Sequence, residues 1–207
     1  MERRWACASC TRKSSTSWPA DTDDHERRGL AAVPRSQDRA VQERIQDELD
    51  TVLAGRVPEF DDLARLRYTR MVVDETLRPT TPAWQTMRGA VGDDEIDGFP
   101  VRGGTGIYIN FLMLHRHPEF WPHPENFDPE RFTPENVAKR PRNAYIPFAS
   151  GPRVCIGKHF ALTELQIVIA MILQAYRLRL PDTAQVQMHP MITLRPKPGV
   201  NVHLERR

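Results

Sequence analysis

The sequence has few cysteines, little net charge and no long apolar run, and each of these absences narrows the possible functions. Three cysteines occur among 207 residues, at Cys7, Cys10 and Cys155. An odd number argues against a disulfide framework and indicates a reducing compartment. The net charge of +2 at pH 7 gives no electrostatic reason to expect nucleic acid or an anionic membrane as a partner.

Membrane and secretory segments are also lacking. No apolar stretch reaches the length that a transmembrane helix needs. The first residues, MERRW, run into polar sequence rich in serine and threonine, unlike the apolar centre of a signal peptide. We therefore expect a cytoplasmic protein.

Composition divides the chain into two parts near residue 35. Residues 1–35 show neither helical nor strand periodicity and are dense in charged and small polar residues. We predict an irregular or disordered tail, unrelated in texture to the rest of the chain. Within it, Cys7 and Cys10 form a C-x-x-C motif without a second pair, so a zinc-binding module is a remote alternative.

Residues 36–207 carry the apolar patterns of a globular, mainly helical region. A first helix is predicted from about residue 36, because apolar residues recur there at helical spacing. A second helix is predicted within residues 58–79, with Asp61 as its N-cap. A third begins near Gly157 and is apolar nearly all round, which predicts a buried helix.

Strand signals occur in two places. Between residues 84 and 110, short β-prone runs separated by glycines and acidic turns predict a small antiparallel sheet. Near the C-terminus, residues 192–194 and 200–204 flank a Pro-Gly turn and predict a hairpin. The predicted fold class is therefore mainly α with small antiparallel β-sheets (α+β).

The stretch FASGPRVCIG places one thiol on a glycine-bounded loop just before a helix. A thiolate that binds a soft metal must be deprotonated, shielded and oriented. The positive end of the following helix would favour the thiolate of Cys155. Gly151 and Gly157 have no side chains, so a flat cofactor could lie on their backbone, and Arg153 is placed to meet an acidic edge of that cofactor.

The pattern Phe148-x-x-Gly151-x-Arg153-x-Cys155-x-Gly157 resembles the haem-binding signature of the cytochrome P450 family. The resemblance implies haem b as the cofactor, with the thiolate of Cys155 as the axial ligand to iron. It also implies that the other four residues of the pattern contact the cofactor, with Phe148 beside the sulfur and Arg153 at a propionate.

A second motif is Glu75-x-x-Arg78, whose ends lie on one face of a predicted helix. By itself it is a common solvated ion pair. Its place upstream of PENFDPERF is similar to the glutamate–arginine–arginine triad of P450s, which implies that Arg131 is the third member of a buried structural network. Arg88 lies where many members of the family carry a haem-propionate arginine, and a solvated strand charge is the alternative.

Four of the seven histidines lie in the part of the chain that carries these motifs, at His115, His117, His123 and His159. His115 and His117 alternate instead of lying four apart on a helix, and none of the four has the spacing of a metal site. We expect surface or capping roles, with a propionate contact by His115 as the alternative.

The resemblance extends from about residue 37 to the C-terminus and implies a partial cytochrome P450 fold over residues 36–207, the C-terminal haem-binding region. The implied activity is that of a haem-thiolate monooxygenase, which inserts one atom of O₂ into a small organic substrate. Its electrons would come from an NAD(P)H-dependent reductase or a ferredoxin. A complete P450 is roughly twice this long or more, so we expect a truncated chain. The alternative is a non-catalytic haem-binding remnant or an inactive fragment.

Overall fold

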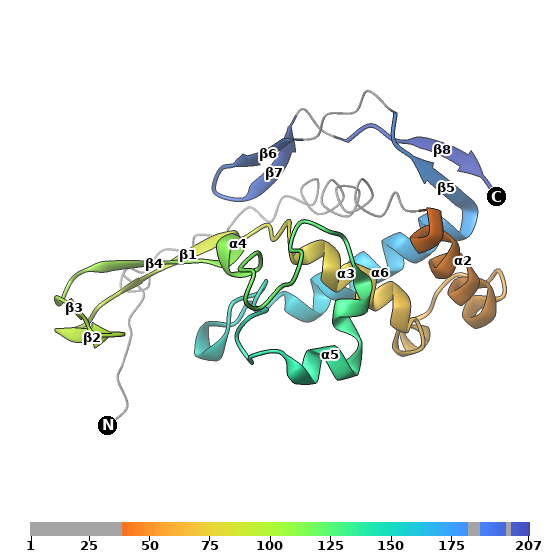
Figure 1. Cartoon of the computed structure of the whole chain (residues 1–207). Helices are drawn as coiled ribbons and strands as arrows, with labels where there is room; N and C mark the ends of the chain where they lie inside the picture. The colour runs from red at the N-terminus through yellow and green to blue at the C-terminus, as the bar shows by residue number, and fades with distance from the viewer. Residues whose placement is uncertain (1–38, 182–186, 198–199) are drawn as a thin grey trace.

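The computed structural model describes residues 39–181, 187–197 and 200–207. Its helices are α2 (Arg39–Leu53), α3 (Arg67–Leu77), α4 (Phe111–Leu114), α5 (Pro134–Lys139) and α6 (Lys158–Ala175), with short 3₁₀ helices η2 (Phe60–Ala64), η3 (Pro129–Phe132) and η4 (Gly151–Arg153). Its strands are β1 (Gln85–Gly89), β2 (Asp94–Ile96), β3 (Phe99–Val101), β4 (Gly106–Asn110), β5 (Tyr176–Arg179), β6 (Gln187–Pro190), β7 (Leu194–Lys197) and β8 (His203–Arg206). The predicted class, helices with small antiparallel sheets, is confirmed (Figure 1). The predicted tail, with Cys7 and Cys10, lies outside the described residues.

Helices α2, α3 and α6 pack together around the core of the described structure (Figure 1). The apolar stripe of α2 faces inward, and Ile45 and Leu49 are fully buried. The side chain of Gln42, also on α2, donates to the carbonyl of Leu178 and accepts from its N–H, both at 2.9 Å. This pair of bonds joins α2 to β5, which directly follows α6, and so fixes the C-terminal end of α6.

The start of α3 differs from the prediction. Asp61 is not its N-cap, because residues 60–64 form the separate 3₁₀ helix η2 and α3 begins only at Arg67. The carboxylate of Glu48, on α2, caps the helix instead, because it accepts from the N–H groups of Tyr68 and Thr69 at 2.7 and 2.9 Å. An acid from a neighbouring helix thus satisfies N–H groups that the helix itself leaves without partners.

Four antiparallel strand pairs lie around the helices, and one of them corrects a prediction. β1 pairs with β4, and β2 with β3 through the Asp97-Gly98 turn, as expected from the short runs between residues 84 and 110. The predicted C-terminal hairpin is wrong. β7 pairs with β6 and β8 pairs with β5, so the strands before and after Pro198-Gly199 in sequence are not partners.

Helix α6 is buried on one side only, which corrects the expectation of a helix buried all round. Ala170 and Leu173 face the core, whereas Phe160 is 70% exposed and Met171 is 50% exposed. The helix begins directly after Cys155-Ile156-Gly157, so its N-terminus carries the cysteine. None of the helices in the described ranges combines the length and the hydropathy that a membrane span requires.

Candidate functional site

The candidate site is the loop of residues 146–157, here called the cysteine loop. It turns first at Ile146, whose carbonyl accepts from the N–H of Ala149 at 3.0 Å. It closes where the N–H of Cys155 donates to the carbonyl of Phe148 at 2.9 Å. Between these bonds Gly151 adopts φ of +74°, a conformation that side chains disfavour. The backbone conformation at position 151 therefore favours glycine over other residues.

Cys155 is a free, exposed cysteine two residues before Gly157, the N-cap of α6. Within the described part of the chain no side chain caps this end of the helix, so its positive end is available to an anion such as a thiolate. Gly157 has an ordinary φ of −81°, so the backbone does not require glycine there. A methyl group at that position would lie 3.8 Å from the Cys155 sulfur, and glycine leaves this space beside the sulfur open.

Apolar side chains around the thiol are exposed. Val154 is 47% exposed, Ile156 102% and Phe160 70%. Phe148, in contrast, is partly buried and packs against the core, and Arg153 is exposed. An exposed thiol framed by exposed aliphatic and aromatic groups is suited to a flat, apolar partner with a soft metal at its centre.

The described residues show no other metal-binding cluster: no group of three or more His, Cys, Asp and Glu side chains is placed to hold an ion. Cys155 by itself supplies one ligand, so a metal bound there must bring its remaining ligands with it. Haem does so, because the porphyrin holds the iron and leaves an axial position for the protein. The residues of the cysteine loop therefore fit this cofactor.

Glu75, Arg78 and Arg131 lie close together and are here called the buried triad. Arg78 donates to both carboxylate oxygens of Glu75, at 2.8 and 2.9 Å, and both side chains are fully buried. The Nε of Arg131 lies 3.7 Å from the same carboxylate, and this arginine also donates to the carbonyl of His123 at 3.0 Å. The N–H of Asp128 donates to Glu75 at 3.0 Å. The triad therefore joins α3 to the chain around η3.

Among the residues predicted to contact the cofactor, Arg88 alone lies outside the cysteine loop. It is on β1, and its guanidinium donates to Thr86 and to the carbonyl of Met87, both at 2.9 Å. These bonds stay within its own strand. The structure therefore has Phe148, Gly151, Arg153, Cys155 and Gly157 in one loop, and it has Arg88 on β1, bonded to that strand.

His115 corrects the expectation of a surface residue. His117, His123 and His159 are exposed as expected, but the His115 ring is fully buried at the C-terminal end of α4. Its Nδ1 lies 3.2 Å from the Arg78 carbonyl, and its Nε2 accepts from the N–H of Ile146 at 3.0 Å. Because both ring nitrogens bond to backbone, the propionate contact considered above is also wrong.

Burial is the main cause that lowers the pKa of His115 to about 4. The bond to the Arg78 carbonyl acts in the opposite direction, and the charges of Arg78, Arg116 and Arg140 lower the pKa further. The ring is therefore neutral at physiological pH.

Sequence reasoning also missed an aromatic cluster beside the triad. The guanidinium of Arg140 lies over the ring of Trp121, 4.0 Å from its centroid, and 4.7 Å from that of Phe132. Arg140 also donates to the carbonyl of Arg131. The regular spacing of aromatics in FWPHPENFDPERF was the available signal, but it does not reveal which cation they surround.

Comparison with known proteins agrees with this geometry. Residues 36–202 match the family model described as Cytochrome P450. The chain is 42% identical over 139 residues to cyclooctat-9-en-7-ol 5-monooxygenase of Streptomyces melanosporofaciens, covering 67% of this chain and 30% of that protein. It is 38% identical over 168 residues to leukotriene-B4 omega-hydroxylase 3 of Mus musculus, covering 79% and 32%.

A solved structure, the cytochrome P450DA heme domain, superimposes with a TM-score of 0.81 at 31% identity, over 90% of this chain and 41% of that one. The chain spans about a third of the length of the curated relatives that it matches. The family match extends over most of the sequence and includes both the cysteine loop and the buried triad. This chain is a member of the cytochrome P450 family.

Proposed function

We propose that the chain is the haem-binding part of a P450 monooxygenase and that the thiolate of Cys155 is the axial ligand of haem b. The observation that carries this proposal is the exposed thiol at the start of α6, framed by the exposed side chains of Val154 and Ile156. When bound, the haem supplies the activation of O₂ that allows one oxygen atom to be inserted into a small organic substrate.

The residues of the cysteine loop have separate roles in this proposal. The N-cap of α6 lies two residues after Cys155, and this end of the helix can accommodate an anionic ligand, while Gly157 leaves the space beside the sulfur open. Arg153 is exposed and can meet a propionate, and Arg88 on β1 is proposed as a second propionate contact, which would require it to give up its bonds to its own strand. Phe148 packs on the core and supports the loop from behind.

The buried triad has a structural role. Glu75 accepts two bonds from Arg78 and one from the N–H of Asp128, and it lies close to Arg131. Burying a carboxylate without hydrogen-bond partners is costly, and these bonds offset that cost. The triad thereby fixes the chain around η3 relative to α3.

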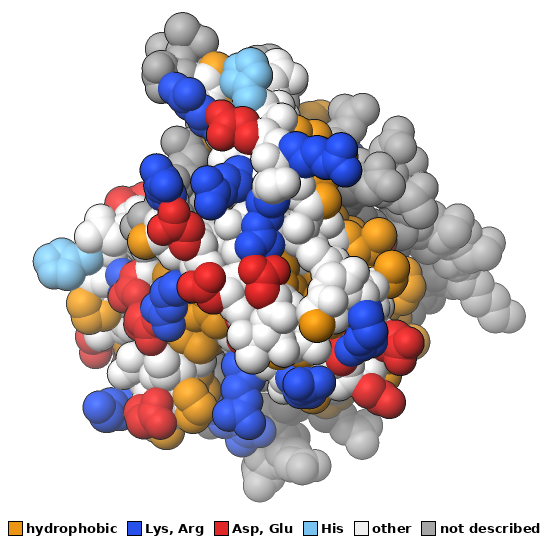
Figure 2. Space-filling view, turned by 90° about the vertical axis from the view of Figure 1, so that its right-hand side faces the viewer, with side chains coloured by type: hydrophobic (Ala, Val, Ile, Leu, Met, Phe, Trp, Pro, Cys, Tyr) orange, Lys and Arg blue, Asp and Glu red, His pale blue; other side chains and the backbone are white. Residues whose placement is uncertain are grey.

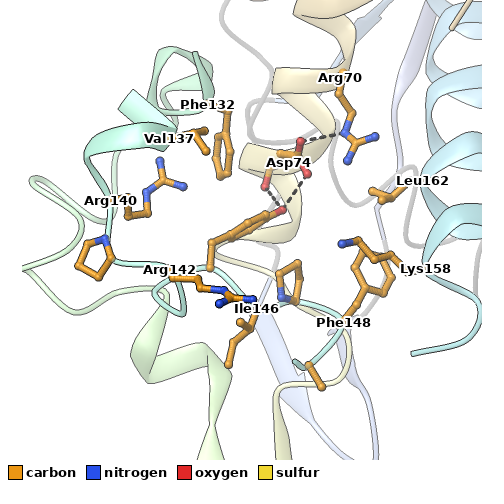
Figure 3. Close-up of a pocket in the computed structure, with 14 residues that line it drawn as sticks. Arg70, Asp74, Phe132, Val137, Arg140, Arg142, Ile146, Phe148, Lys158 and Leu162 are labelled. Carbon is orange, nitrogen blue, oxygen red and sulfur yellow. Dashed lines mark hydrogen bonds and ion pairs between the residues drawn. The ribbon is translucent and has the colours of Figure 1, made fainter. Parts of the chain in front are cut away.

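A cationic pocket beside the cysteine loop is the proposed docking place of the electron donor. The pocket has a volume of about 510 Å³, and Lys158, at the start of α6, is among its lining residues together with Phe148 (Figure 3). The charged lining residues are Arg70, Arg140, Arg142, Lys158 and Asp74. Four cations and one carboxylate favour an acidic partner.

The side of the molecule with α2 and the C-terminal strands shows basic and acidic side chains interspersed (Figure 2). That side does not share the excess of cations found in the pocket. We propose an NAD(P)H-dependent reductase or a ferredoxin as the donor that presents an acidic face to it.

The ligand assignment is tested by reconstituting the full chain with haem and recording the spectrum of the reduced, carbon monoxide-bound form. We expect a thiolate-type Soret band that Cys155→Ala abolishes. The matched control is the double variant Cys7→Ala/Cys10→Ala, which should keep the band. A band that survives Cys155→Ala would show that another group binds the iron.

The docking proposal is tested by charge reversal. Lys158→Glu and Arg142→Glu should slow reduction of the haem by the donor by on the order of tenfold at low salt, with a smaller effect at high salt. Arg102→Glu, which follows β3 at a distance from the pocket residues in sequence, is the control. Equal rates for all variants would place the donor elsewhere.

A second candidate function is haem binding without turnover. The exposure of Ile156 and Phe160 favours it, because an open apolar face beside the ligand does not keep water from a bound cofactor. Haem retention with the thiolate-type spectrum, but without product from any organic substrate in the presence of a donor, would support this function over the monooxygenase.

A further inference from the structure

The buried ring of His115 stands between two backbone segments that are distant in sequence. The N–H of Ile146 points to its Nε2 at 3.0 Å. Because a backbone N–H can only donate, Nε2 must be the acceptor, and the ring proton must lie on Nδ1. Nδ1 then donates to the carbonyl of Arg78 at 3.2 Å. The neutral ring is therefore fixed in one tautomer by two bonds of opposite direction.

One of these bonds ties His115 to the buried triad. Besides accepting from the ring, Arg78 donates through Nη1 to the backbone carbonyl of His115 at 2.9 Å. The two residues thus hold each other by a reciprocal pair of bonds. Since Arg78 is itself fixed by two bonds to Glu75, the ring has a rigid support.

The other bond leads into the cysteine loop. Ile146 opens the turn in which Ala149 donates back to its carbonyl at 3.0 Å. Phe148, inside that turn, accepts from the N–H of Cys155 at 2.9 Å. A continuous series of hydrogen bonds therefore runs from Glu75 through Arg78, His115 and the 146–149 turn to the backbone of the cysteine.

We propose that His115 is a positioning residue that fixes the cysteine loop, and with it the ligand Cys155, relative to the buried triad. This inference rests on the proposed function for the meaning of Cys155 as a ligand, whereas the bonds that carry it do not involve the cofactor. Groups that hold metal ligands in place from behind commonly change metal affinity by about 10–100-fold when they are removed.

A ring that merely filled space would have a different signature. His115 does pack against aromatic rings, with centroids 6.5 Å from Trp121 and 5.4 Å from Tyr145. If packing were its role, any side chain of similar size would replace it equally well. If positioning is its role, only a side chain that accepts a hydrogen bond from the Ile146 N–H will replace it.

Two amide variants separate these cases because each reproduces one ring nitrogen. His115→Gln can bring its side-chain oxygen to the place of Nε2 and accept from Ile146. His115→Asn can bring its side-chain nitrogen to the place of Nδ1 and donate to Arg78, but it is too short to reach Ile146. Both variants remain polar, and both lose one bond.

The primary measurement is hydrogen exchange at the amides of Ile146 and Cys155 in the haem-free full chain. We expect His115→Gln to keep the protection of both amides within a few-fold of the parent chain. His115→Asn should speed exchange at both amides by about tenfold, the equivalent of 1.4 kcal/mol. In the haem-loaded chain, His115→Asn should also show at least a several-fold smaller share of the thiolate-type Soret band than His115→Gln.

Two results would overturn the proposal. One is protection of Ile146 and Cys155 in His115→Asn equal to that of the parent chain. The other is an equal loss in both variants, which is what a packing role predicts. If the parent chain gives no thiolate-type band, or if Cys155→Ala keeps it, the proposed function fails, yet the exchange measurement still decides whether His115 fixes the loop.

Discussion

The side chains on the two sides of the cysteine loop differ in burial and in whether they have partners within the protein. Behind it, Glu75, Arg78 and His115 are fully buried, and each has hydrogen-bond partners within the described chain. In front of it, Ile156 and Phe160 are apolar and exposed. The first region is complete without a ligand, whereas the second gains free energy only when something apolar covers it. Under the proposed function, the buried residues would fix the ligand Cys155, and the exposed residues would meet the cofactor.

The largest effect is expected when the buried side loses a charge. Glu75→Gln leaves the Arg78 guanidinium buried without a counter-charge, so we expect the free energy of unfolding to fall by about 3–5 kcal/mol. Urea denaturation followed by circular dichroism measures this loss. The matched control is Glu130→Gln, which breaks an exposed ion pair with Arg44 and should cost less than about 1 kcal/mol. Similar losses for both variants would contradict the difference between the two regions.

The buried side should also respond to pH through His115. Its pKa is lowered from 6.5 to about 4 in the folded state, chiefly by burial, so the unfolded chain binds more protons between these values. Stability should therefore fall as the pH drops from about 6.5 to about 4, by up to roughly 3 kcal/mol. Arg78, Arg116 and Arg140 face the ring and oppose its protonation.

Denaturation at a series of pH values checks this dependence. His115→Gln should flatten the curve between pH 6.5 and pH 4, because the group that titrates is gone. The same substitution at the exposed His203 should leave the curve as it is. A parent chain whose stability stays constant over this interval would show that the ring is not held neutral by the fold.

A smaller effect on the free energy of unfolding is expected in the cysteine loop itself. Gly151→Ala forces a side chain into φ of +74°, where nothing lies within 4 Å of the new methyl group, so the cost is one of backbone conformation. We expect a loss of about 1–2 kcal/mol, measured by thermal unfolding. Gly106→Ala, where the methyl group would lie 3.6 Å from the sulfur of Met87, should be neutral or stabilising. Equal effects would mean that the loop can change its backbone freely.

The features that were predicted correctly depend on residues close together in the sequence, or on the order in which motifs follow one another along the chain. Glu75 and Arg78 are three residues apart on one helix, so helix geometry alone puts them together. Cys155 stands just before a helix, and Gly157 leaves the space beside its sulfur open.

The failures share a different cause, which is dependence on distant partners. A Pro-Gly sequence lies between β7 and β8 in the chain, yet each strand pairs with another one. A turn signal in the sequence does not show whether the two strands beside it are partners. His115 bonds to backbone groups 37 and 31 residues away, and a backbone group has no sequence signature. The cap of α3 likewise comes from Glu48 on another helix.

The front of the loop offers the sharpest test, because there stability and ligand binding should respond separately. Ile156 is fully exposed, so Ile156→Ser should change the free energy of unfolding of the haem-free chain by no more than about 0.5 kcal/mol. If haem covers the Ile156 side chain, that burial contributes about 1.5–3 kcal/mol to the free energy of haem binding. Ile156→Ser removes this contribution, so haem should bind more weakly by about tenfold or more. Haem titration measures the second effect, and urea denaturation the first. Val57→Ser, at an aliphatic residue that is 70% exposed on the loop after α2, should change neither quantity. An Ile156→Ser chain that unfolds more easily but binds haem as before would place Ile156 in the core instead of at the cofactor, and the two sides of the loop would no longer differ.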